Sequence, residues 1–246
     1  MAKIIAFYLP QFHPIPENDI WWGKGFTEWT NVGKAKPLFK GHYQPIVPAD
    51  LGYYDLRISE VREEQVKLAR EAGIEGFCYW HYWFAGRRLL ERVFDEVVES
   101  GSPDFPFCLC WANHSWHNPK TKEIILRQNY EGIDDYKDHF YHVLPAFKDK
   151  RYIKIDNKPV FSIFEAESIP NANEYIKLWN ELAISEGFNG IYFIGIVQTP
   201  EEYLKIQNIN LDAINVVRLK DFLRYRTFWQ DKIKYMFSDI HNYKYE

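Results

Sequence analysis

The stretch Gly76-Phe-Cys-Tyr-Trp-His-Tyr-Trp-Phe84 decides the fold, because it is an aromatic and apolar run of the length of a buried strand. We expect this strand to span Glu75–Trp83. Apolar residues recur at helical spacing on both sides of it, over 58–72 and 89–98, and each helical pattern ends at a glycine. A buried strand between two helices of this length predicts a parallel βαβ arrangement.

The same alternation continues in both directions along the chain. Strand-like runs occupy Lys3–Leu9, Phe107–Ala112, Val160–Phe164, Ile191–Val197 and Asp212–Val217. Helical patterns occupy 136–147, 175–183 and 201–206. Asp55 and Asp134 are possible N-caps of the helices that follow them. A hairpin is expected around Asp156-Asn157-Lys158, with its second arm in the sheet.

These elements favour an α/β fold of the (β/α)₈ TIM-barrel type. Such a barrel needs about 250 residues, and the chain has 246, but only six core strands are indicated. The irregular stretch from Pro10 to about Asp55 takes up much of the length. We therefore expect a single domain over 1–246 with about six of eight units, ending near 217 and followed by an aromatic tail over 218–246. A doubly wound sheet is the alternative, but its early glycine-rich phosphate loop is missing.

Composition and charge narrow the classes of function. The net charge of −4 argues against nucleic acid as a partner, and no apolar run approaches the length of a membrane span. Cys78, Cys108 and Cys110 are too few for a disulfide framework, so we expect buried free thiols and a cytoplasmic protein. Phosphate-binding loops and metal-ligand motifs are absent from the sequence, which predicts no cofactor and no metal ion.

Aromatic residues are the unusual feature of the composition. They make up 18% of the chain, and seven of the nine tryptophans lie between Trp21 and Trp116. The flat, amphipathic rings of Trp and Tyr suit the apolar C–H face and hydroxyl rim of a sugar. A protein interface is the alternative, because it is also enriched in aromatic residues.

Polar and aromatic side chains follow the first three expected strands, and in a barrel these strand ends meet on one face. The candidate substrate-binding residues are Tyr8, Gln11, His13, Trp22, Glu28, Trp29, His81, Trp83, Asn113 and Trp116. Taken singly, His81 also fits a hydrogen-bonded core histidine, and Asn113 also fits a turn cap. Glycosidic chemistry usually needs two carboxylates, for which the candidates are Glu28 and Glu165. Alternatively, Glu28 is a structural carboxylate that holds the long loop in place, and Glu165 is an ordinary surface carboxylate.

Four motifs, in this order, resemble WbsX-type proteins, which are labelled glycosyltransferases and are similar to the endo-α-mannosidases of glycoside hydrolase family 99. The motifs are Phe7-Tyr-Leu-Pro-Gln-Phe-His13, Trp22-Gly-Lys-Gly-Phe-Thr-Glu-Trp-Thr-Asn-Val32, Gly76-Phe-Cys-Tyr-Trp-His-Tyr-Trp-Phe84 and Cys110-Trp-Ala-Asn113. The resemblance covers roughly residues 3–217. It implies a (β/α)₈ barrel that acts on glycans, with the strand-end aromatics, Glu28, His81 and Asn113 in the pocket.

The sequence departs from the family pattern in two places. Asn113-His-Ser-Trp116 stands where relatives commonly have Asn-Glu-Asn-Trp, so His114 replaces an acidic residue. The late Asn-Glu-Trp-x-Glu-Gly segment, which carries the two working glutamates of the hydrolases, is also absent. We therefore expect a C-terminally shortened relative, in which Glu28 and Glu165 would have to replace that pair as acid/base and nucleophile or stabiliser.

The function implied by the resemblance is biosynthesis or processing of a surface polysaccharide (O-antigen, lipopolysaccharide or capsule). The reaction would be glycosyl transfer or retaining hydrolysis on a mannose-like or related sugar. The expected partners are a glycan or a sugar donor and acceptor, with peripheral association with the polysaccharide-assembly machinery; the oligomeric state is open. The alternatives are a carbohydrate-binding or assembly module without catalysis, and an inactive truncated fragment.

Overall fold

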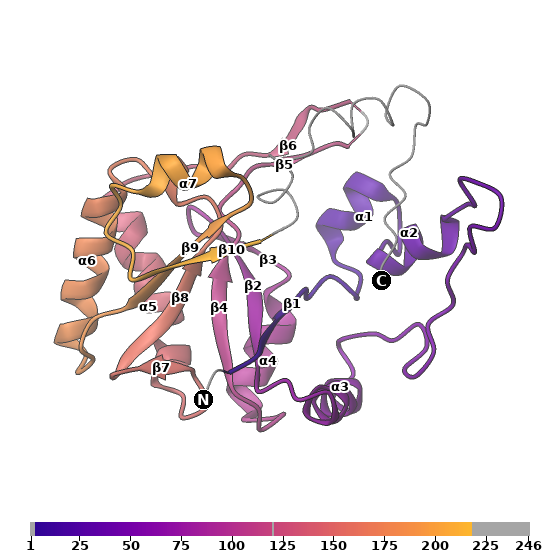
Figure 1. Cartoon of the computed structure of the whole chain (residues 1–246), viewed down its shortest axis with the longest axis horizontal. Helices are drawn as coiled ribbons and strands as arrows, with labels where there is room; N and C mark the ends of the chain where they lie inside the picture. The colour runs from indigo at the N-terminus through magenta and orange to yellow at the C-terminus, as the bar shows by residue number, and fades with distance from the viewer. Residues whose placement is uncertain (1–2, 120, 218–246) are drawn as a thin grey trace.

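The computed structural model describes residues 3–119 and 121–217, and its centre is a curved sheet of six parallel strands in the order β1-β2-β4-β8-β9-β10 (Figure 1). The strands are β1 (Ile5–Tyr8), β2 (Gly76–Phe84), β4 (Phe107–Trp111), β8 (Lys158–Ile163), β9 (Tyr192–Val197) and β10 (Ala213–Val216). Within the described residues, β1 and β10 are the edges of an open half-barrel. The predicted TIM-barrel-like fold with six core strands is confirmed, and the expected tail over 218–246 lies outside the described residues.

Four long helices cover the outer face of the sheet (Figure 1). They are α3 (Ser59–Glu71), α4 (Glu91–Ser100), α5 (Ile133–Lys148) and α6 (Ala172–Ser185). Each turns a stripe of apolar side chains toward the strands, and these include the fully buried Phe140 and Phe147 on α5 and Trp179 on α6. Gly73 and Gly101, which follow α3 and α4, adopt positive φ angles of 76° and 72°.

Shorter elements surround the strand ends. The stretch expected to be irregular contains two short helices, α1 (Pro16–Trp22) and α2 (Glu28–Lys34). The other elements are β3 (Arg87–Leu89), β5 (Trp116–His117), β6 (Ile124–Leu126), β7 (Lys154–Ile155), the 3₁₀ helix η1 (Ala166–Ser168) and α7 (Pro200–Ile206). The predicted hairpin is present, with Ile155 paired to Lys158. In the described part of the chain, no helix is long and apolar enough to cross a bilayer.

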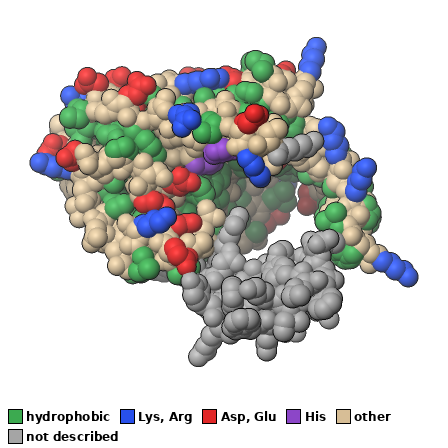
Figure 2. Space-filling model, turned by 90° about the horizontal axis from the view of Figure 1, so that it is seen from above, with side chains coloured by type: hydrophobic (Ala, Val, Ile, Leu, Met, Phe, Trp, Pro, Cys, Tyr) green, Lys and Arg blue, Asp and Glu red, His purple; other side chains and the backbone are tan. Residues whose placement is uncertain are grey.

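Alternation along β2 decides which side chains face the helices and which face the hollow of the half-barrel. Cys78 lines a cavity of about 360 Å³ on the concave face together with Phe7 and Cys108. Residues an even number of positions along the strand share that face, so Tyr82 points the same way and His81 points to the helices. The carboxyl ends of the strands open onto the hollowed face seen in Figure 2.

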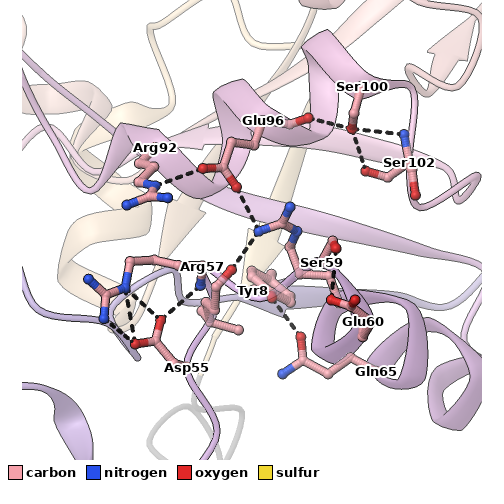
Figure 3. Close-up of polar contacts among 12 residues, drawn as sticks. Tyr8, Asp55, Arg57, Ser59, Glu60, Gln65, Arg92, Glu96, Ser100 and Ser102 are labelled. Carbon is pink, nitrogen blue, oxygen red and sulfur yellow. Dashed lines mark hydrogen bonds and ion pairs between the residues drawn. The ribbon is translucent and has the colours of Figure 1, made fainter.

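Both predicted N-caps are wrong. Asp55 forms an ion pair with Arg57 at 2.6 Å and accepts a hydrogen bond from the Arg57 amide, while α3 begins later, at Ser59 (Figure 3). Asp134 lies inside the first turn of α5, which begins after Gly132. An acidic residue there still complements the positive end of the helix dipole, which explains why the sequence resembled a cap.

Candidate functional site

The residues after β1 are fastened to the start of α2. The Thr27 side chain accepts a hydrogen bond from the Trp29 amide at 3.2 Å, and the Thr30 hydroxyl accepts one from the Thr27 amide at 3.2 Å. This reciprocal cap fixes the first turn of α2. The Glu28 amide donates to the Gln11 carbonyl at 3.3 Å, so α2 is also tied to the segment that leaves β1. Glu28 is thereby presented from a fixed helix start.

A cleft of about 460 Å³ lies between α1 and α2 on one side and the segment after β4 on the other. Its lining combines four aromatic rings with hydroxyl, amide, imidazole and carboxylate groups. The lining residues are Gln11, Trp22, Phe26, Glu28, Asn31, Tyr82, His114, Ser115, Trp116, His117 and Pro119. A concave site with apolar walls and a few convergent polar groups is typical of small-ligand binding.

The aromatic wall is a packed assembly. The Trp116 ring meets Tyr82 edge-on, with 5.3 Å between ring centroids, and it meets Trp21 at 5.6 Å. Trp22 packs against Phe26 at 6.0 Å. Because these rings support one another, their exposed faces are held ready for a flat apolar ligand surface.

The charges of the lining are few. Glu28 is the one carboxylate among the described lining residues, and this set contains neither Lys nor Arg. The Asn31 amide donates to Glu28 Oε2 at 3.5 Å, at the limit of a hydrogen bond. Burial raises the pKa of the Tyr82 phenol, and nearby Cys110 and Glu28 raise it further. Tyr82 therefore stays protonated at neutral pH and can donate a hydrogen bond.

His114 contributes a neutral imidazole. Burial, and secondarily the proximity of His117, lowers the pKa of His114. Its Nδ1 is buried and makes no hydrogen bond within the described residues, while its ring packs against Phe164 at 5.1 Å between centroids. A neutral imidazole offers one donor and one acceptor, which matches a sugar hydroxyl.

Asn113 joins the ends of β4 and β8. Its side-chain amide donates to the Glu165 carbonyl at 2.7 Å and to the Tyr130 hydroxyl at 2.9 Å, and its Oδ1 accepts from the Glu165 amide at 2.8 Å. Tyr130 in turn donates to the Asn113 carbonyl at 3.0 Å. The Glu165 carboxylate accepts a hydrogen bond from Ser168 at 3.1 Å and does not line the cleft. The predicted carboxylate pair is thus not brought together there.

The structure brings four of the predicted site residues into the cleft, namely Gln11, Trp22, Glu28 and Trp116. Three others point into the helix layer. The Tyr8 hydroxyl donates to Gln65 on α3 at 2.6 Å, His81 Nε2 lies 2.9 Å from His139 Nε2 on α5, and Trp83 donates to Asp135 at 2.8 Å. Side-chain alternation in the strands places them on the face opposite the cleft.

Two further predicted residues lie in the segment around the cleft without lining it. His13 is buried, and burial lowers its pKa although nearby Asp55 acts in the opposite direction. Trp29 donates its indole N–H to the Tyr54 carbonyl at 2.8 Å and packs against Phe12. Both are placed to shape the segment between β1 and α3.

The prediction left out Phe26, Asn31, Tyr82, His114 and His117 as binding residues. The sequence shows that Tyr82 faces the side of the strand opposite to His81, because side chains alternate along a strand, but it does not show which side lines the cleft. Asn31 follows Glu28 by three residues, the spacing of one helical face, but that helix was not predicted.

Comparisons with known proteins place this geometry in context. The family model described as Glycosyltransferase WbsX matches residues 4–244. The chain is 41% identical over 194 residues to "Uncharacterized protein WxcX" of Xanthomonas campestris pv. campestris, in strains B100 and ATCC 33913. The match covers 78% of this chain and 28% of WxcX, so the chain spans just over a quarter of the curated relative.

Solved structures show the same fold at low sequence identity. A GH99 endo-alpha-mannosidase from Bacteroides thetaiotaomicron superposes with a TM-score of 0.55 and 14% identity, over 87% of this chain and 58% of that enzyme. A protein described as glycoside hydrolase-like gives a TM-score of 0.55 and 17% identity, over 92% of this chain and 62% of that one. These similarities support the barrel-type architecture.

Proposed function

Since this chain belongs to the WbsX glycosyltransferase family, we propose that it acts on a glycan of surface-polysaccharide metabolism, such as lipopolysaccharide O-antigen or capsule, and holds it in the cleft between α2, β2 and the segment after β4. The observation that carries the proposal is the lining of that cleft. The half-buried Trp22 and Trp116 offer flat faces for the C–H side of a sugar ring, and amide and imidazole groups offer hydrogen bonds for its hydroxyls.

The ligand we assign to the cleft is a neutral, mannose-like oligosaccharide. A diphosphate or another anionic group would need cationic partners, and the described lining contains neither Lys nor Arg. His114 does not supply the missing charge, because its lowered pKa leaves it neutral.

For chemistry on the glycan, Glu28 is the residue we assign to proton transfer. In the protonated form its carboxyl would donate a proton to the glycosidic oxygen as the bond to the anomeric carbon breaks, and water or an acceptor hydroxyl would form the new bond to that carbon. Asn31 lies against the Glu28 carboxylate and would orient it. Glu165 is left out of this assignment, because its carboxylate is bound by Ser168 outside the cleft.

Glycan binding without bond cleavage is the second candidate function. It is favoured by the single carboxylate of the described lining, because glycosidases usually use two. The two functions share one binding site and differ in turnover.

Binding is tested by titrating the full chain with neutral mannose- and rhamnose-containing oligosaccharides in isothermal calorimetry. Trp116→Ala should weaken binding by about tenfold, because a stacking face is lost. Tyr141→Ala is the matched control, since Tyr141 is an exposed aromatic residue on α5, away from the cleft lining, and it should bind like wild type. If the wild-type chain binds none of these oligosaccharides, or if both variants lose affinity equally, the proposed binding site is wrong.

Turnover is tested separately with Glu28→Gln, which keeps the size of the side chain and removes its proton chemistry. We expect the variant to bind oligosaccharide within a few-fold of wild type and to release no product. A variant that turns over like wild type would exclude Glu28 as the proton-transfer group. Binding without any turnover in the wild-type chain would favour the second function.

A further inference from the structure

The end of α2 and the segment that follows it display apolar side chains to solvent. We call residues 34–47, Lys34-Ala-Lys-Pro-Leu-Phe-Lys-Gly-His-Tyr-Gln-Pro-Ile-Val47, the basic apolar loop. Its exposed large hydrophobic residues are Leu38, Phe39, Tyr43, Ile46 and Val47, of which Tyr43 is 72% and Leu38 65% exposed. Single exposed apolar side chains are ordinary, but five within ten residues mark an interaction surface.

The basic apolar loop has its own internal structure. The His42 amide donates to the Phe39 carbonyl at 3.1 Å, and the Leu38 amide donates back to His42 Nδ1 at 3.2 Å. The Phe39 ring stacks on the His42 ring, with 4.6 Å between centroids and 9° between planes. Hydrogen bonds and ring stacking therefore order this turn, and the apolar side chains of the loop point outward instead of packing into the core.

The charge of the loop has one sign. Lys34, Lys36 and Lys40 are exposed, and none of them forms an ion pair with another described residue. No acidic residue occurs between Trp29 and Ala49, although the whole chain has a net charge of −4. Basic (Lys or Arg) and hydrophobic side chains project from the lobe at the right of Figure 2, which is the side of α2 in Figure 1.

We propose that the basic apolar loop docks on an anionic phospholipid surface. Lysine side chains are attracted to the negative headgroups, and apolar side chains between them enter the boundary between headgroups and acyl chains. A membrane of this kind satisfies both properties of the loop, whereas a surface that offers only acidic groups would leave the five apolar side chains without a partner. This proposal does not depend on the glycan proposal.

Docking in this way would bring the cleft close to the membrane. Glu28 and Lys34 lie at the two ends of α2, and six residues of helix span about 9 Å. A glycan in the cleft would then be held within about one helix length of the lipid surface.

The test is co-sedimentation of the full chain with vesicles of phosphatidylcholine alone and of phosphatidylcholine mixed with phosphatidylglycerol. We expect binding to the anionic vesicles only, and weaker binding at higher salt, which screens the attraction. Replacing Lys34, Lys36 and Lys40 together by alanine should reduce binding by about fivefold per lysine, roughly a hundredfold in all. Replacing Leu38 and Val47 by serine should also weaken binding, with all charges kept.

A control variant removes three lysine charges outside the basic apolar loop. The side chains of Lys67, Lys137 and Lys177 are 64%, 44% and 77% exposed. They lie on α3, α5 and α6, outside the loop, so their combined replacement by alanine should leave vesicle binding within about twofold of wild type. Equal binding to both kinds of vesicle, binding to neither, or an equal loss in the control variant would overturn the proposal. Oligosaccharide binding by the loop variants should be unchanged, which separates this result from the cleft experiment.

Discussion

Asn113 shows how much one side chain can hold together. It bridges the backbone of Glu165 and the hydroxyl of Tyr130 with three side-chain hydrogen bonds, and it is 1% exposed. Asn113→Ala should lower the free energy of unfolding by about 2–4 kcal/mol, because it removes three hydrogen bonds from a buried side chain and leaves its half-buried partners unsatisfied. Urea denaturation measures this change.

Tyr130→Phe provides the comparison for that prediction. It removes one hydroxyl from the same network and should cost only about 1 kcal/mol. If Asn113→Ala is no more destabilising than Tyr130→Phe, then Asn113 does not join the two strand ends in the way described.

At the scale of single residues, the sequence could place side chains near the strand ends but could not say which face they occupy. His81 and Tyr82 are neighbours in one aromatic run in which both faces of the strand are buried, so polarity does not alternate. Because polar and apolar residues do not alternate here, the sequence predicts His81 as a substrate-binding residue and gives no reason to include Tyr82. Trp116 and Glu28 required only that their segments lie beside the strand ends, and the structure places them there.

At the scale of elements, the contact of β2 with α5 predicts sensitivity to acid. His81 and His139 face each other at 2.9 Å, with Trp83 stacked on His139 and with Arg88 and His142 nearby. Burial, more than these charges, holds the pKa of both histidines well below the usual value. The unfolded chain therefore takes up protons below about pH 6.5 that the folded chain does not.

The sign of the effect follows from that difference. The stability is fully present above about pH 6.5 and falls as the pH decreases toward the folded-state pKa values, by up to about 1.4 kcal/mol per pH unit for each histidine. His139→Phe should flatten the decline, which urea denaturation between mildly acidic and neutral pH would measure. At pH 8 neither the wild type nor the His139→Phe variant carries a charge at this position, so the difference in the free energy of unfolding at that pH gives the cost of the changed packing alone. An unchanged slope would contradict the assignment.

The long helices and the strands of the sheet were more predictable from the sequence than the long segment between β1 and α3. The four long helices carry strong periodic patterns and the six strands are short apolar runs, and all ten were located within a few residues. The short helices α1 and α2 were not predicted, because seven residues among Pro, Gly and Trp give too few turns for a periodic pattern. Since α2 supplies Glu28 and Asn31, this gap also removed part of the cleft from the prediction.

At the scale of the whole molecule, the connected apolar core predicts cooperative unfolding. The larger of two clusters joins buried residues from Val66 on α3 to Ile206 on α7, and Trp80 packs against both this cluster and the smaller one around Tyr82. The described chain should therefore lose its structure in one transition. Differential scanning calorimetry checks this, because the calorimetric and van't Hoff enthalpies should agree. Two resolved transitions would mean that the half-barrel contains independent units.

The aromatic packing around α6 has a spectroscopic consequence. The Tyr175 ring packs between Trp111 and Trp179, with ring centroids 5.7 Å from Trp111 and 4.9 Å from Trp179, and all three residues are buried. Rings this close and this rigid couple their electronic transitions, so the near-ultraviolet circular dichroism should carry a strong signal from the core. Because these rings lie on the helix side of the sheet, that signal would report the packing of α6 on the strands independently of anything bound in the cleft.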